Sequence, residues 1–182
     1  MRITAYNRGR KKKKTVVLHN MFMPIWLLWF FPVTWIIILP GNFVFDLLIL
    51  ALGMKICRVQ RIGQQLKKSI VKTWLFGFVA DFMGMAPLFL PKWYFDFRSE
   101  QGETGGLVET VYNAVWYDPF QTAASFLIVT LGVAVSIVFI FIFNYYFALK
   151  ETELSRKEKK RTALILAVVT APWMFYFPTL GW

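Results

Sequence analysis

Residues 122–149 read TAASFLIVTLGVAVSIVFIFIFNYYFAL, an apolar stretch without a single charged side chain. A helix needs about 20 apolar residues to cross the hydrocarbon core of a bilayer, which is about 30 Å thick. Four more segments qualify or nearly qualify, at residues 21–39, 43–56, 73–90 and 163–182. The sequence therefore predicts an all-α fold, a multi-pass transmembrane helix bundle of about five spans in a single integral membrane domain (1–182).

The composition does not fit a soluble protein, which would have to bury its apolar residues beneath a polar surface. Of all residues, 57% are hydrophobic and only 17% are charged, whereas a soluble domain is about half apolar and a quarter charged. Too little polar surface remains to cover the rest. The net charge of +11 would suggest nucleic acid in a soluble protein. Here the placement of the charges explains it better, so we expect the lipid bilayer as partner and no nucleic acid.

Lysines and arginines fall almost entirely on one side of the predicted spans. Seven precede the first span, six lie between the second and third, and six lie between the fourth and fifth. Only Lys92 and Arg98 fall on the other side, in the loop 92–121. Because basic loops are retained in the cytoplasm, we predict cytoplasmic loops at 55–72 and 150–162. The chain is then a plasma-membrane protein with its N-terminus cytoplasmic and its C-terminus outside.

The N-terminal tail, residues 1–20, carries a cluster of basic side chains. Its members are Arg8, Arg10, Lys11, Lys12, Lys13 and Lys14. We interpret the cluster as a topology determinant beside anionic lipid, where each charge contributes about 1 kcal/mol. Docking of an acidic cytoplasmic partner is the alternative. The apolar stretch that follows is long and has no small-x-small cleavage site, so we expect an uncleaved anchor.

The sequence Pro40-Gly41-Asn42 is a strong turn signal between the first two predicted spans. The second leg, up to Lys55, would be only about 18 Å long. Lys55 and Arg58 can extend its reach by snorkelling. A re-entrant hairpin is the alternative, and both readings return the chain to the same side.

The end of the outer loop has a helical pattern. Apolar side chains recur at Leu107, Val108, Val111, Tyr112, Val115 and Trp116. This spacing predicts one short amphipathic interfacial helix. It either connects two spans along the membrane surface or packs over the bundle as a lid.

Two acidic residues lie inside apolar segments, and these are the candidate ion, proton or buried polar site. Asp81 is 9 residues from Lys72 and 11 from Lys92, near the middle of the bilayer. An acid at that depth costs about 2.5–3.5 kcal/mol on insertion scales, so it needs a partner, water or a proton. Asp46 follows the predicted turn by four residues and lies shallower. It either joins Asp81 on a cation or proton path or sits in the first turn of its helix, where the helix dipole favours a carboxylate.

Small residues mark candidate helix-packing seams. Gly77, Ala80 and Gly84 form a stripe beside Asp81, and Gly132 and Ser136 form a small-xxx-small pair. Such residues let another helix approach closely. They favour contacts between helices, within the chain or with a partner.

An enzyme is disfavoured, because no clustered nucleophile, acid pair or motif for phosphate binding is present. The single cysteine, Cys57, and the single histidine, His19, exclude a Cys/His zinc cluster. We therefore expect no catalytic residue, no metal and no cofactor.

Two functions remain open. One is a small transport or channel-type membrane subunit with Asp81 as its buried acid. At 182 residues it would act as a homo-oligomer or with a partner membrane protein. The alternative is a non-catalytic accessory or scaffold membrane protein, in which Asp81 and the seams pack against a partner. The substitution Asp81→Asn separates them, through loss of flux or loss of assembly.

Overall fold

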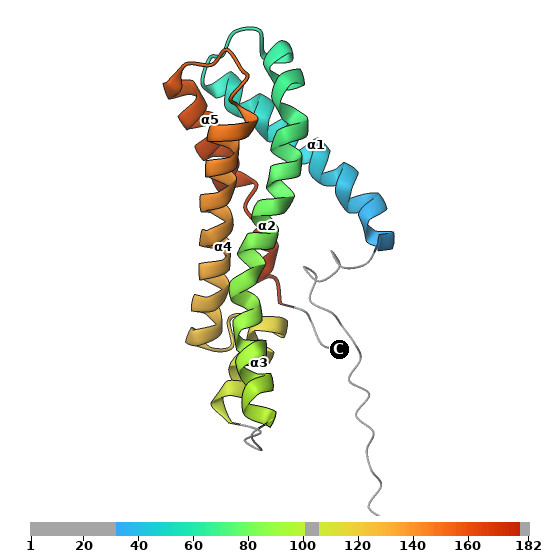
Figure 1. Ribbon diagram of the computed structural model, residues 1–182, viewed down its shortest axis with the longest axis vertical. Coiled ribbons are helices and arrows are strands. Elements are labelled where there is room, and N and C mark those ends of the chain that lie inside the picture. Colours follow the sequence, from blue (N-terminus) through green and yellow to red (C-terminus); the bar gives the residue numbers. More distant parts are fainter. Residues whose placement is uncertain (1–31, 101–105, 179–182) are drawn as a thin grey trace, which may run out of the picture.

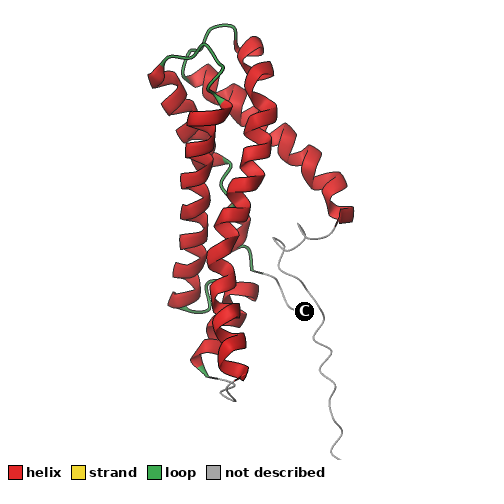
Figure 2. Cartoon of the chain, viewed as in Figure 1, coloured by secondary structure: helices red, strands yellow, loops and turns green. Residues whose placement is uncertain are grey.

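The computed structural model describes residues 32–100 and 106–178. Within these two ranges the chain is helical, with turns and irregular segments between the helices and no β-strand (Figure 2). The elements are α1 (Pro32–Ile56), α2 (Ile62–Glu100), α3 (Leu107–Tyr117), α4 (Ala123–Phe143), the π-helical η2 (Asn144–Ala148), α5 (Arg156–Val169) and the 3-10 helix η3 (Trp173–Tyr176). The prediction of an all-helical chain is confirmed for these residues.

Two antiparallel helices, α2 and α4, lie side by side and set the long axis of the molecule (Figure 1). Helix α1 contacts α2 and α5 near one end and then diverges from the bundle at an angle. The short α5 packs against α1 and α4 at that end, while α3 packs on α2 and α4 at the opposite end.

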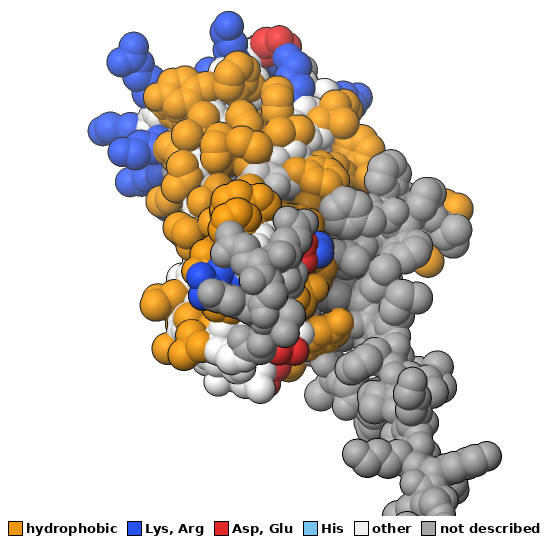
Figure 3. Space-filling view, turned by 60° about the horizontal axis from the view of Figure 1, so that its bottom comes forward, with side chains coloured by type: hydrophobic (Ala, Val, Ile, Leu, Met, Phe, Trp, Pro, Cys, Tyr) orange, Lys and Arg blue, Asp and Glu red, His pale blue; other side chains and the backbone are white. Residues whose placement is uncertain are grey.

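Within the described residues, three helices are long and apolar enough to cross a membrane: Ile36–Ile56, Ile62–Arg98 and Ala123–Ala148. Much of their apolar surface faces outward, with 75% of Ile36 and 66% of Leu127 exposed. Figure 3 shows hydrophobic side chains over the flank of the molecule and most Lys and Arg side chains gathered at one end. Such a surface is unfavourable in water and suits lipid. The fold therefore indicates a helical membrane protein.

The predicted break at residues 40–42, and with it the re-entrant hairpin, is wrong, because α1 runs through these residues without interruption. A proline removes one backbone N–H, but membrane helices tolerate this where neighbouring groups bond the affected backbone. In addition, the carbonyl of Leu39, next to Pro40, accepts a hydrogen bond of 3.1 Å from Nε1 of Trp74, which ties this part of α1 to α2. Residues 21–31 of the first predicted span lie outside the described residues.

The predicted last span, 163–182, does not form one helix over its described part. Helix α5 has 14 residues, about 21 Å, and ends at Val169. Pro172 cannot donate a backbone hydrogen bond and disfavours helical geometry in the residue before it. The chain continues as a short 3-10 turn instead. The described residues thus contain three helices able to cross a membrane, and the five predicted spans are not confirmed. Residues 179–182 lie outside the described residues.

The other two predicted spans lie inside longer helices. Residues 73–90 belong to α2, which has 39 residues and a length of about 58 Å. Residues 122–149 correspond to α4 and its continuation η2. Much of the predicted basic loop 55–72 is therefore helix, and the reversal between α1 and α2 is confined to residues 57–61.

The short reversal depends on two residues with left-handed backbone geometry. Arg58 and Arg61 have φ angles of 56° and 52°. This geometry costs a residue with a side chain roughly 1–2 kcal/mol. Val59, between them, is buried in the core and holds the turn in place.

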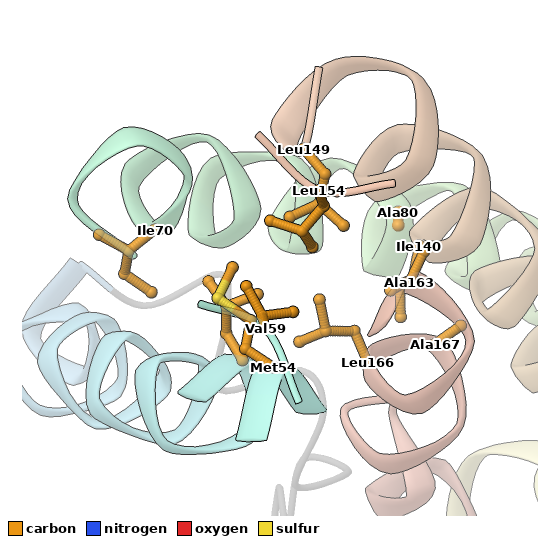
Figure 4. Close-up of a cluster of buried hydrophobic side chains, with 11 residues drawn as sticks. Met54, Val59, Ile70, Ala80, Ile140, Leu149, Leu154, Ala163, Leu166 and Ala167 are labelled. Carbon is orange, nitrogen blue, oxygen red and sulfur yellow. The ribbon is translucent and has the colours of Figure 1, made fainter. Parts of the chain in front are cut away.

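The apolar core has two parts. One lies at the end that carries the reversal, where Leu50 and Met54 of α1 pack against Ile140, Leu149 and residues of α5 (Figure 4). The other joins α2, α3 and α4 and includes Leu88, Val115 and Val129. Helix α3 stands where the sequence predicts an amphipathic helix, with Ala114 and Val115 buried.

Candidate functional site

A cavity of about 270 Å³ lies between α1, α2 and the segment that follows α5. Asp46 and Asp81 both line it. The other lining residues are Asn42, Phe45, Trp74, Gly77, Phe78, Met85, Val169, Thr170, Ala171, Pro172, Trp173, Met174 and Phe175. The structure therefore brings together the two acids that the sequence singled out.

The α1 wall consists of Asn42, Phe45 and Asp46, which share one face of the helix through spacings of three and four residues. Asp46 lies 14 residues after Pro32, in the interior of α1. Its assignment to the first turn of a helix is wrong, because no helix begins at Asn42. The helix dipole therefore does not explain this carboxylate, since the effect fades beyond the first turn.

The two acids are offset along α2, because the Asp46 carboxyl group lies beside Gly77, four residues and about one helical turn from Asp81. Both acids belong to helical stretches that are apolar enough to cross a membrane.

The α2 wall consists of Trp74, Gly77, Phe78, Asp81 and Met85, which recur at helical spacing. Gly77 faces the acid of the other wall. A Cβ atom at this position would lie 3.6 Å from Oδ2 of Asp46, an ordinary contact distance. The missing side chain at Gly77 therefore leaves room for the Asp46 carboxyl group beside α2.

Among the described residues, neither acid has a basic partner. Oδ1 of Asp81 is buried and has no hydrogen-bond partner among the described residues. The ion pairs in this part of the chain are Lys68–Glu153, Lys72–Glu151 and Lys92–Asp96, and none involves Asp46 or Asp81. Two ionised carboxylates in one cavity would also repel each other. A buried polar atom without a partner is costly, so this arrangement favours a bound positive charge or a proton.

The third wall is the interrupted end of α5. The carbonyls of Val169 and Thr170 accept no backbone hydrogen bond from the described residues. Non-helical backbone at membrane depth is tolerated where it lines a cavity, and a helix C-terminus carries partial negative charge. This wall therefore adds to the negative character of the site. The sequence signalled it only through Pro172, and our prediction of the site did not include it.

The predicted packing residues bring α2 and α4 together within the chain. A Cβ atom on Gly84 would lie 2.7 Å from the carbonyl oxygen of Gly132 and would also collide with Oγ of Ser136. Ala80 is fully buried in the core cluster at the other end of this contact. Gly77, the fifth predicted packing residue, lines the cavity instead.

Other predicted features do not reach this site. None of the lining residues comes from α3, so a lid role for that helix over the cavity has no contact to support it. The basic cluster from Arg8 to Lys14 lies outside the described residues. Within residues 32–100 and 106–178, no group of three or more His, Cys, Asp or Glu side chains could hold a metal ion.

Comparison of the chain with protein-family models, with curated proteins and with solved structures finds no match in any of the three. The class that the fold defines is a helical membrane protein, and its function has to be argued from the cavity itself.

Proposed function

We propose that the protein is a small transport or channel-type membrane subunit that binds a cation or a proton at Asp81, with Asp46 as the second acid of the site. The observation that carries the proposal is the shared cavity, which is lined by two carboxyl groups from different helices. An acid near the middle of a bilayer costs about 2.5–3.5 kcal/mol on insertion scales. A chain that used them for packing alone would place a donor beside each, and Oδ1 of Asp81 has none among the described residues.

The accessory or scaffold alternative loses part of its basis. Gly84, Gly132 and Ser136 contact one another within the chain, so no partner is needed to explain them. We still expect the subunit to work as a homo-oligomer or with a partner membrane protein, because the three helices of the described residues that could cross a membrane enclose little space for a pathway.

The test is cation or proton flux into liposomes that contain the purified chain. We expect Asp81→Asn to abolish most of the flux and Asp46→Asn to reduce it, with unchanged elution from a sizing column. Glu109→Gln is the control, because this exposed acid lies on α3, away from the cavity. Loss of assembly alone would support the accessory role, and unchanged flux in both aspartate variants would overturn the proposal.

We further propose that the basic end of the bundle faces the cytoplasm of the plasma membrane. Lys and Arg are concentrated there, on the α1–α2 reversal and on residues 150–161, and basic segments are retained in the cytoplasm. The side on which the N-terminus lies depends on residues before Pro32, outside the described residues.

The single cysteine offers a direct test of this orientation. Cys57 lies at the α1–α2 reversal and is partly accessible. We expect a membrane-impermeant maleimide to label it in inside-out vesicles and not in intact cells. Glu109→Cys in a Cys57→Ser background should show the reverse pattern. Labelling of Cys57 from outside the cell would overturn the orientation.

A further inference from the structure

The cavity is lined by aromatic rings as well as acids. Phe45 comes from α1, Trp74 and Phe78 come from α2, and Trp173 and Phe175 come from the segment after α5. All three walls therefore contribute at least one ring beside the two carboxyl groups.

The two tryptophans of the cavity use their N–H groups elsewhere. Nε1 of Trp74 donates to the carbonyl of Leu39 at 3.1 Å, and Nε1 of Trp173 donates to the carbonyl of Val168 at 2.9 Å. With these donors engaged, the indole rings offer a ligand mainly apolar surface and the negative face of the π system. Both suit the alkyl or aryl groups around an organic cation.

A bare metal ion fits the cavity poorly. Hard cations such as Ca²⁺ take six to eight oxygen ligands in close contact. Here most lining side chains are apolar, and side-chain oxygens come from few residues, chiefly Asn42, Asp46, Asp81 and Thr170. The cavity volume of about 270 Å³ is also far larger than one dehydrated metal ion needs. For comparison, one water molecule in the liquid takes up about 30 Å³.

We propose that the ligand of this site is a small organic cation, a protonated amine or a quaternary ammonium compound. Asp81 and Asp46 neutralise its charge, and the rings of Trp74, Phe78 and Trp173 contact its apolar groups. This inference rests on the proposed function, whose cation it assigns to a chemical class.

The probe is phenyltrimethylammonium, titrated into the full chain in detergent and followed by calorimetry. Its uncharged counterpart, tert-butylbenzene, has the same shape, and empty micelles correct for its partitioning. We expect saturable binding of the cation alone. Asp81→Asn should weaken it on the order of 100-fold, the loss typical when one partner of a buried charge pair is removed.

Aromatic variants test the rings separately. Phe78→Leu and Trp74→Leu should each weaken binding roughly tenfold, which lies between the effects of an exposed and a fully desolvated cation–π contact. Trp74→Phe keeps a ring but loses the N–H donor and should bind nearly as well as the wild type. Phe82→Leu is the matched control, because Phe82 lies on the same helix but does not line the cavity.

The outcomes separate this inference from the proposed function. Binding of Na⁺ or K⁺ that depends on Asp81, without binding of phenyltrimethylammonium, would overturn the organic-cation class and leave the cation site standing. Equal binding of tert-butylbenzene, or binding insensitive to both aspartates, would overturn the inference. If no cation binds and flux is unaffected by Asp81→Asn, both proposals fail. Unchanged elution of each variant from a sizing column shows that it remains folded.

Discussion

Two glycines on α2, Gly77 and Gly84, lie seven residues apart and therefore on nearly the same face of the helix. At Gly84 the neighbour is α4, whose backbone carbonyl at Gly132 would lie 2.7 Å from an added Cβ atom. At Gly77 the neighbour is α1. The nearest atom to an added Cβ there is Oδ2 of Asp46, 3.6 Å away, and both residues line the cavity. The same stripe of small residues therefore packs against α4 at Gly84 and lines the cavity at Gly77, two helical turns away.

The difference follows from the path of α1. Helix α4 runs alongside α2, whereas α1 diverges from it (Figure 1). Where two helices stay together, glycines allow their backbones to touch and van der Waals packing to replace the missing hydrophobic force. Where they separate, the space left beside a glycine can hold polar groups and a ligand. The close α2–α4 contact therefore fixes the position of α2, and α2 in turn forms one wall of the cavity.

Breaking the seam should have the largest effect. In Gly84→Val the new side chain meets the backbone of Gly132, which cannot move unless α2 and α4 separate. We expect a loss of unfolding free energy of about 3 kcal/mol or more, above the usual 1–3 kcal/mol for overpacking, since backbone has to yield. The measurement is the thermal unfolding midpoint in detergent.

Gly63→Ala is the control for that experiment. It lies on the same helix with nothing within 4 Å of an added Cβ atom. Its stability should stay the same or rise by up to about 1 kcal/mol, because alanine favours helix over glycine. If both variants unfolded alike, the close contact between α2 and α4 would not contribute to stability.

Filling the cavity should affect binding far more than folding. Gly77→Ala places a Cβ atom at ordinary contact distance from Asp46, so we expect normal stability and nearly normal binding. Gly77→Leu extends a larger side chain into the cavity and should weaken binding of phenyltrimethylammonium at least tenfold, with little change in the unfolding midpoint. A large drop in that midpoint, comparable with Gly84→Val, would show that both glycines belong to one seam.

Sequence patterns predicted the helical class and the two informative acids, because both signals are local. A run such as residues 122–149 can only be buried in lipid or protein, and an acid such as Asp81 stands out within an apolar segment. The pairing of Asp46 with Asp81 remained one of two readings. Choosing between them requires the course of α1, which depends on its contacts with α2 rather than on local turn preferences.

The errors have the same origin. Pro40-Gly41-Asn42 predicts a turn by local preference, yet α1 continues through these residues, next to Trp74 of α2. The third wall of the cavity was missed because Pro172 predicts a bend but not what the bent segment contacts. Only the position of the break after Val169, next to α1 and α2, makes Trp173 and Phe175 part of a site.

The smallest expected effect concerns the exposed ion pairs that join the start of α2 to the loop before α5. Glu153 bonds Lys68 at 2.9 Å, and Glu151 bonds Lys72. The hydrogen bond from Lys72 holds the pKa of Glu151 below its ordinary value of 4.5, and the bond from Lys68 does the same for Glu153. Because these pKa values are lowered in the folded state, the pairs stabilise the fold at pH values above 4.5. Their contribution disappears as the pH falls through the lowered values.

We therefore compare the wild type with the double variant Glu151→Gln and Glu153→Gln across pH. At neutral pH the variant should unfold at a slightly lower temperature, since exposed ion pairs contribute little. The difference should shrink to nothing once both glutamates are protonated in the wild type. High salt should also reduce it, because exposed charges are screened. A difference that persisted in acid would instead point to the backbone contact nearby, in which Oε1 of the buried Gln65 accepts the N–H of Glu153 at 3.0 Å. This neutral hydrogen bond does not titrate and would hold the start of α2 to the loop before α5 independently of charge.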